Sequence, residues 1–199
     1  MENELRTLHE TIRNDLKQKE FRNKVKSEHD SLRNLFNPLI SIPEIRNINI
    51  ESKEELKELT DDQKTLFCYR VLKEVFSDYY FTRGLFEKDC LDLIGKDFDV
   101  VARIRLSNHK MNIESPNLFI RKMFAKFDFM IELVNIDSFK KDAGLKLIKK
   151  LKEVSEKTYI PIWLYDLNTK DKKYFENLGF KLQGKYGLNN EPLRIYFSK

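Results

Sequence analysis

The spacing of apolar residues along the chain changes near residue 98. Before that point, apolar residues recur mostly every three or four positions, which is typical of amphipathic helices. After it, stretches with a period of two appear, which are typical of strands. We therefore expect a mainly helical first half and most of the strands in the second half.

The first helix is predicted over residues 3–36, and Asn37-Pro38 is expected to end it. Because its charges are mixed and form no basic stripe, we interpret it as a helix that packs on the body or pairs with a second copy. Residues 1–36 are thus treated as an N-terminal amphipathic helical extension, and residues 37–199 as one domain. Its apolar positions are Leu5, Leu8, Ile12, Leu16, Phe21, Val25, Leu32 and Phe36.

Between residues 43 and 95 the pattern predicts one short strand, over 43–50, and three helices. Ser52 followed by Glu55 is a capping-box pattern that begins the first helix. Thr60-Asp61-Asp62 begins the second, which is expected to run to about Tyr80. The third is predicted over 86–94 and closed by Gly95.

The clearest strand is predicted over residues 127–136, where both faces are largely apolar, as in a central strand covered on both sides. Weaker candidates lie at 98–104 and 118–124, and 106–116 is interpreted as a hairpin or loop. The remaining expected elements are a helix over 145–157, a strand over 159–167, a short helix over 168–178 and closing strands over 180–182 and 193–197.

Composition supports helices with a modest sheet, because six Gly and five Pro in 199 residues are too few for a turn-dense sandwich or barrel. No apolar run reaches 18 residues, so no membrane span is expected, and the polar N-terminus does not read as a secretory signal.

Two cysteines without a CxxC motif suggest reduced core thiols and a cytoplasmic protein. The three histidines are isolated, so no metal site is expected.

The positive charge of the chain is concentrated at its C-terminal end. The whole chain carries +5, whereas residues 138–199 hold 14 Lys and Arg against 7 Asp and Glu. Such an excess suits an anionic ligand, either a nucleotide-like cofactor or nucleic acid, but it also fits a solvated lysine face. The aromatic residues of this region are interpreted as buried rather than interleaved with the lysines, so nucleic acid is the less favoured partner.

Two segments near the C-terminus carry candidate chemistry. The first is a strand, loop and helix over residues 134–151. A loop that leaves a buried strand and enters a helix presents free backbone N–H groups and the positive end of the helix dipole to a phosphate. Lys140 and Lys141 add charge there, and Gly144 allows a close backbone approach.

The second segment covers residues 168–180 and contains the short helix predicted over 168–178. Asn168 is placed to cap it, Tyr174, Phe175 and Leu178 to pack it, and Gly179 to end it. Together the two segments resemble the GNAT N-acetyltransferase superfamily over residues 127–199, most specifically in Tyr-Phe-Glu-Asn-Leu-Gly-Phe at 174–180. The resemblance implies an α/β (α+β) fold: a mixed, mostly antiparallel central sheet flanked by helices, here with an N-terminal helical extension.

The GNAT resemblance also implies a function, the direct transfer of an acetyl group from acetyl-CoA to an amine, without a metal. Glu132, the acid in the buried-looking middle of the central strand, is the candidate base, and Tyr174 is the candidate acid that protonates the departing thiolate. The residues that would bind acetyl-CoA are Val134, Asn135 and Ile136 for the pantetheine arm, Lys140, Lys141, Asp142, Ala143, Gly144 and Leu145 for the pyrophosphate, and Asn168 and Phe175 on the far side of the channel.

Two positions depart from the GNAT pattern. The family's loop reads Gln/Arg-x-x-Gly-x-Gly/Ala, whereas this chain has Phe139 and Asp142 at the first and fourth positions. Many members carry a Tyr where this chain has Phe175, so the hydroxyl of Tyr174 is displaced by about 100° around the helix. The alternative function is therefore a catalytically inactive GNAT-fold interaction protein that uses its N-terminal helix for dimerisation or partner binding.

Overall fold

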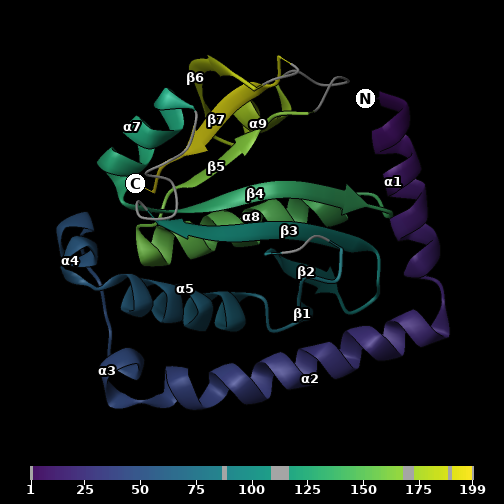
Figure 1. Cartoon of the computed structure of the whole chain (residues 1–199), viewed down its shortest axis with the longest axis horizontal. Coiled ribbons are helices and arrows are strands. Elements are labelled where there is room, and N and C mark those ends of the chain that lie inside the picture. The colour runs from purple at the N-terminus through teal and green to yellow at the C-terminus, as the bar shows by residue number, and fades with distance from the viewer. Residues whose placement is uncertain (1, 87–88, 109–116, 168–172, 188–189, 199) are drawn as a thin grey trace.

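The structure is a computed structural model that describes residues 2–86, 89–108, 117–167, 173–187 and 190–198 (Figure 1). Within these residues, seven strands form one sheet in the order β1-β2-β3-β4-β5-β7-β6. All neighbouring strands are antiparallel except β4 and β5. The expected fold class, a mostly antiparallel mixed sheet flanked by helices, is confirmed. The strands are β1 (Tyr79–Arg83), β2 (Leu91–Gly95), β3 (Val100–Asn108), β4 (Phe129–Ser138), β5 (Ile162–Tyr165), β6 (Lys181–Tyr186) and β7 (Pro192–Tyr196).

Helices cover both faces of the sheet. On one face, α5 and α8 bury the apolar side chains that alternate along β3, β4 and β5. On the other face, α7 packs beside Met130 and Trp163, and α1 packs beside Ile94 and Val101. The described helices are α1 (Glu2–Asp15), α2 (Lys19–Ser41), α3 (Pro43–Arg46), α4 (Lys53–Glu58), α5 (Asp61–Val75), α7 (Leu118–Phe127), α8 (Ala143–Thr158) and α9 (Tyr174–Asn177).

Helix α2 runs along the outer strand β1, at the bottom of Figure 1. His29 on this helix accepts a hydrogen bond at Nδ1 from the backbone N–H of Phe81, at 2.9 Å. Since an edge strand exposes backbone groups that would otherwise pair with another chain, α2 protects this edge. Burial lowers the pKa of His29, which keeps the ring neutral and able to accept.

The single N-terminal helix predicted over 3–36 is wrong, because the chain forms α1 and α2 with a turn between them. The turn follows Leu16, where the next apolar residue comes five positions later, at Phe21, and the helical spacing is lost. The predicted stop at Asn37-Pro38 is also wrong, since α2 continues to Ser41. Pro38 is exposed, so water can satisfy the carbonyl that loses its helical donor.

Four further elements differ from the prediction. The strand expected over 43–50 begins as the helix α3, since Pro43 is pre-organised for a first helical turn. The strand expected over 118–124 is α7, because the side chain of Asn117 caps it by accepting from the N–H groups of Phe119 and Ile120. The helix expected over 86–94 instead contains β2, and the one predicted to reach Tyr80 ends at Val75, before β1.

The remaining predictions hold in outline. Ser52 caps α4, and Thr60 with Gln63 forms a complete capping box at the start of α5. The central strand is β4, and the later helix–strand order is confirmed, with α9 shorter than expected. Of the loop expected over 106–116, Leu106–Asn108 belongs to β3, and residues 109–116 lie outside the described part of the chain.

Candidate active site

The parallel strands β4 and β5 diverge soon after they meet. They are in register only at Ile131 with Ile162 and at Glu132 with Trp163. Beyond that pair, β4 continues to Ser138 beside β3, whereas β5 continues beside β7. The resulting V opens towards α1 in Figure 1. Beyond Glu132, the β4 side of the opening pairs with β3 on one edge and, among the described residues, with no strand on the other.

A β-bulge lies in β4 just past the point of divergence. Arg103 of β3 is opposite Asn135, and the next residue, Ile104, is opposite Leu133, so Val134 is the extra residue. A bulge interrupts the regular ladder and turns the local backbone. The sequence prediction placed Val134, Asn135 and Ile136 at the pantetheine arm, and the structure places all three on the β4 side of the V.

Polar residues form a strip on the face of the sheet between α1 and α7. Glu132 accepts a hydrogen bond from Arg105 of β3, between Oε2 and Nη1 at 2.6 Å. Trp163 lies opposite Glu132 on β5, and its ring makes an edge contact with Tyr165. The pKa of Tyr165 is raised, first by burial and then by the charges of Glu132 and Glu191, so its hydroxyl stays protonated. Glu132 is thus a part-buried carboxylate held by a cation at the narrow end of the V.

A second set of charges lies deeper on the same face. Arg103 is buried and bonds Asp137 of β4, with Nη2 to Oδ2 at 3.0 Å, and it lies 3.9 Å from Asp92 of β2. Asp92 also accepts from the hydroxyl of Thr82 and from the N–H groups of residues 85 and 86. Burial nevertheless raises the pKa of Asp92 to about 6.

The buried Asp92 predicts a specific pH dependence of stability. Its folded-state pKa of about 6 lies above its ordinary 3.8, so the folded chain binds this proton more tightly than the unfolded chain. Its contribution to the free energy of unfolding therefore decreases, by about 3 kcal/mol, as pH rises from about 4 to about 6. Urea denaturation of the native chain and of Asp92→Asn across this window measures the difference. A difference that does not change between pH 4 and 7 would contradict the assignment.

The loop between β4 and α8 has the geometry expected of a phosphate-binding turn. Asp142 adopts a left-handed conformation (φ 64°), which explains how it stands where the family has Gly. Its side chain is exposed and makes no cap hydrogen bond with the first turn of α8. Gly144 lies tightly against β4, because a Cβ there would be 3.2 Å from the Cβ of Ser138. The Ser138 hydroxyl accepts from the Gly144 N–H and donates to the Lys140 carbonyl.

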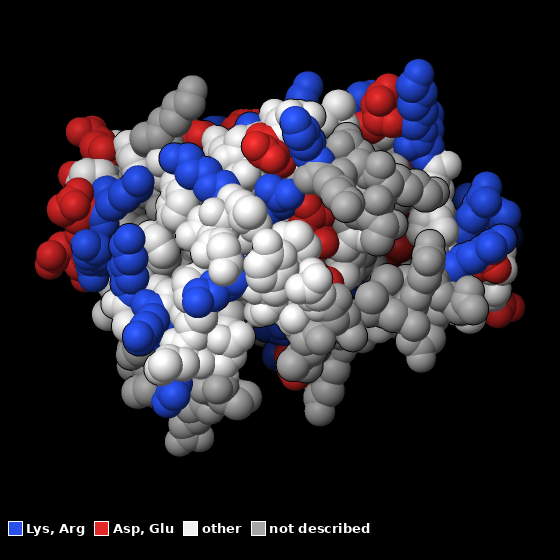
Figure 2. Space-filling model, turned by 90° about the horizontal axis from the view of Figure 1, so that it is seen from above, with Lys and Arg blue, Asp and Glu red and all other residues white. Residues whose placement is uncertain are grey.

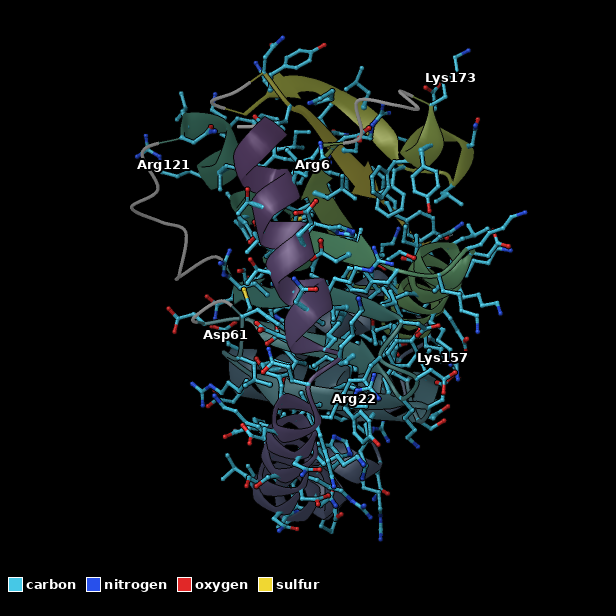
Figure 3. All side chains as sticks on the ribbon, turned by 90° about the vertical axis from the view of Figure 1, so that its right-hand side faces the viewer. Arg6, Arg22, Asp61, Arg121, Lys157 and Lys173 are labelled. Carbon is cyan, nitrogen blue, oxygen red and sulfur yellow. The ribbon has the colours of Figure 1, made fainter. Side chains whose placement is uncertain are left out.

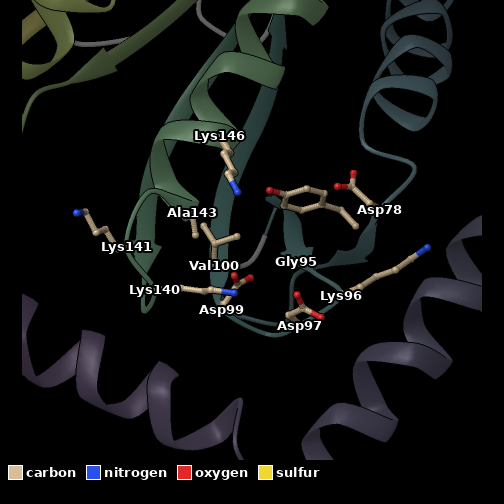
Figure 4. A pocket seen from close by; sticks show the side chains of 11 residues that line it. Asp78, Gly95, Lys96, Asp97, Asp99, Val100, Lys140, Lys141, Ala143 and Lys146 are labelled. Atoms are coloured by element: carbon tan, nitrogen blue, oxygen red, sulfur yellow. The ribbon is translucent and has the colours of Figure 1, made fainter.

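Lysines surround the start of α8. Lys140 and Lys141 are exposed, and with Lys146 they line a cavity of about 330 Å³ on the β1–β2 side of the helix (Figure 4). The same cavity is lined by Asp78, Asp97 and Asp99, so its charge is mixed. The predicted residues Ala143 and Gly144 are buried, and Leu145 is half-buried in the first turn of α8.

The second predicted segment is only partly described. Tyr174 begins α9, is half-buried and packs edge-on against Phe175, whose ring is buried against Phe180. Gly179 follows α9 with φ +90°, the left-handed conformation that favours glycine. Asn168 lies outside the described residues.

A central strand that splays from its parallel neighbour, followed by a glycine-containing loop and a helix, is the arrangement that the C-terminal motifs imply. Two solved structures are similar to this chain: Bacillus subtilis N-acetyltransferase YlbP with coenzyme A (16% identity, TM-score 0.37, 75% of this chain and 91% of that chain covered) and "histone acetyltransferase HPA2 and related acetyltransferase" from Corynebacterium glutamicum (12%, 0.39, 88% and 91%). No family model and no curated protein matches the sequence.

Sequence reasoning on the candidate site missed the cations of β3 and the aromatic residues of β5. Arg103 and Arg105 stand two positions apart in a strand that is otherwise apolar from Val100 to Leu106, a spacing that places both on one face. That signal was available, but it becomes meaningful only when the β3–β4 register puts Glu132 opposite Arg105 and brings Asp137 within reach of Arg103. Among the described residues, no group of His, Cys, Asp or Glu is arranged to hold a metal, and no helix is long and apolar enough to cross a membrane.

Proposed function

We propose that this chain is an N-acetyltransferase that binds acetyl-CoA in the β4–β5 splay and transfers the acetyl group directly to an amine. The splay with its bulge at Val134 carries the proposal. Backbone groups of Val134, Asn135 and Ile136 would bond the pantetheine arm. A backbone N–H beside the bulge would polarise the thioester carbonyl and stabilise the oxyanion that forms on attack.

The pyrophosphate would lie at the start of α8. This helix has 16 residues, so its N-terminus carries a substantial partial positive charge. Lys140 and Lys141 add formal charge from the exposed loop. The Asp142 side chain makes no cap bond, and the N–H groups of Ala143 and Gly144 bond the Lys140 carbonyl and the Ser138 hydroxyl, so a phosphate would exchange with these loop bonds.

Proton transfers would fall to Glu132 and Tyr174. Glu132 would take the proton of the acceptor amine, directly or through water, from the polar strip between α1 and α7. Arg105 holds this carboxylate in place. Tyr174 would protonate the departing CoA thiolate. Because Tyr174 is half-buried on α9, this role requires the thiol end of the cofactor to lie beside α9.

Transfer activity is tested by following the CoA thiol released from acetyl-CoA in the presence of small polyamines, amino acids and peptides with free N-termini. Thiol release that depends on one class of amine, with a matching gain in product mass, supports the proposal. Release that no amine accelerates, with no acetylated product, would contradict it.

Removing the loop charges is expected to weaken cofactor binding. The double variant Lys140→Ala/Lys141→Ala should raise the Kd for acetyl-CoA by about tenfold or more, because two exposed cations near the pyrophosphate each contribute modestly. Calorimetric titration at low and at physiological salt measures this. The matched control is Lys24→Ala/Lys26→Ala, which removes the same charge from two exposed positions on α2, outside the predicted cofactor site. Equal Kd values for the two double variants would contradict the placement.

A surface on α2 supports the alternative function, an interaction protein. Leu35 and Leu39 are 57% and 42% exposed and lie one turn apart on this helix, and Ile42, which follows the end of the helix, is 42% exposed. A second copy of the chain would bury this row of three. The variant Leu35→Glu should convert a dimer to a monomer in light scattering, whereas a monomeric native chain would contradict dimerisation through this row.

The C-terminal basic excess gives less support to nucleic acid binding. Figure 2 shows the molecule from above, and on this face some Lys and Arg side chains of the described residues stand beside Asp and Glu while others stand singly among uncharged residues. A phosphate backbone is bound best by a continuous basic surface. We therefore propose acetyl-CoA as the anionic ligand of this region.

A further inference from the structure

Helix α1 makes direct contact with both ends of the turn from β4 into the phosphate-binding loop. His9 bonds Asp137, the penultimate residue of β4, with Nδ1 and Oδ1 2.9 Å apart. The same ring packs against Phe139, the first residue of the loop, with ring centroids 4.7 Å apart. A single side chain of the N-terminal helix thus touches the two residues that flank Ser138.

The contact is anchored firmly on both sides. Ile12 of α1 and Leu16, which follows this helix directly, are 1% and 2% exposed and pack with Val101 of β3. On the sheet, Asp137 is held by Arg103 and by the side-chain amide of Asn135. Figure 3 shows α1 running across this end of the sheet.

His9 contacts the same loop that carries the candidate phosphate ligands, Lys140 and Lys141. The Phe139 N–H donates to the carbonyl of Asp99, at 2.8 Å, and the neighbouring Ser138 hydroxyl bonds Gly144 and Lys140. A contact that holds Phe139 in place therefore also restrains Ser138 and, through its hydroxyl, Lys140 and Gly144. A loop held in its binding conformation loses less entropy when a ligand binds.

We propose that α1 is a working part of the cofactor site, and that His9 is a positioning residue that holds the phosphate-binding loop through Phe139 and Asp137. This inference rests on the proposed function. It also gives a reason for Phe139, which stands where the family has Gln or Arg: its ring serves as the docking point for α1 and not as a phosphate ligand.

The test is calorimetric titration of CoA into the full chain and into variants. His9→Ala and Phe139→Ala should each raise the Kd for CoA by about tenfold. Because each variant removes the same ring contact between His9 and Phe139, the double variant should bind CoA little worse than either single variant. His9→Gln, whose amide can still donate to Asp137, should have an intermediate effect. The control on the same helix is Arg6→Ala, whose exposed side chain pairs with Glu10.

Hydrogen exchange on the unliganded chain separates this inference from the proposed function. His9→Ala should speed exchange of the amides of residues 138–145 while the midpoint of global unfolding stays near that of Arg6→Ala. If exchange in that segment does not change, or if His9→Ala binds CoA as the native chain does, the positioning role is wrong. If the native chain fails to bind CoA while exchange still responds to His9, the loop is positioned by α1 and the acetyltransferase proposal fails alone.

Discussion

Replacing Glu132 by Gln is expected to lower kcat for acetyl transfer by about 100- to 1,000-fold and to leave the Kd for CoA unchanged. The variant keeps the size of the side chain and a hydrogen-bond acceptor for Arg105, but it cannot take a proton from the amine. Losses of this size are typical when a general base is removed. Steady-state kinetics with the best amine from the acceptor screen, together with CoA titration, measures both quantities.

Glu176→Gln provides the matched control for Glu132→Gln, because Glu176 is an exposed carboxylate on α9. A rate that rises with pH in the native enzyme and loses that dependence in Glu132→Gln would identify the carboxylate as the base. A kcat within about threefold of the native value would show that another group takes the proton, and Glu132 would then be only the structural partner of Arg105.

Replacing Arg103 by Met is expected to lower the free energy of unfolding by about 3–5 kcal/mol at pH 7. Arg103 is 3% exposed and faces two buried carboxylates, Asp92 and Asp137, which the variant would leave without their cation. Because Asp92 can take up a proton, the loss should be smaller at pH 5 than at pH 7. Urea denaturation at the two pH values measures both effects.

The control for Arg103→Met is Arg121→Met, on the exposed side of α7, which is expected to change stability by less than about 0.5 kcal/mol. If Arg103→Met costs less than about 1 kcal/mol at pH 7, the buried charges are not held by Arg103 as described. A loss of the same size at both pH values would instead contradict the raised pKa of Asp92.

The sequence predicted the fold best where local signals agreed with tertiary packing. The β4 strand, the loop and α8 were placed correctly because an apolar run, a charged turn and a helical period follow one another without conflict. The errors at 86–94 and 118–124 have another origin. There, short apolar runs fit a strand and a helix equally, and the decision depends on pairing with β1 and β3 or on the Asn117 cap.

The candidate site was predictable only in part, for a similar reason. Lys140, Lys141 and Gly144 lie within one local motif, so sequence spacing alone brings them together. Arg105 and His9 reach the site from a different strand and from the N-terminal helix, and only sheet register and the docking of α1 bring them to Glu132 and Asp137. The splay and the bulge at Val134 are properties of strand pairing and have no local signature.

The measurement that tests the central claim most directly is isothermal titration of the native chain with acetyl-CoA and, separately, with CoA. The proposal predicts a Kd in the micromolar range for acetyl-CoA, corresponding to about −8 kcal/mol, since the splay, the loop lysines and the start of α8 would all contact the cofactor. No detectable heat with either compound at millimolar concentration would contradict the acetyltransferase function. The exposed row of α2 would then become the leading functional surface.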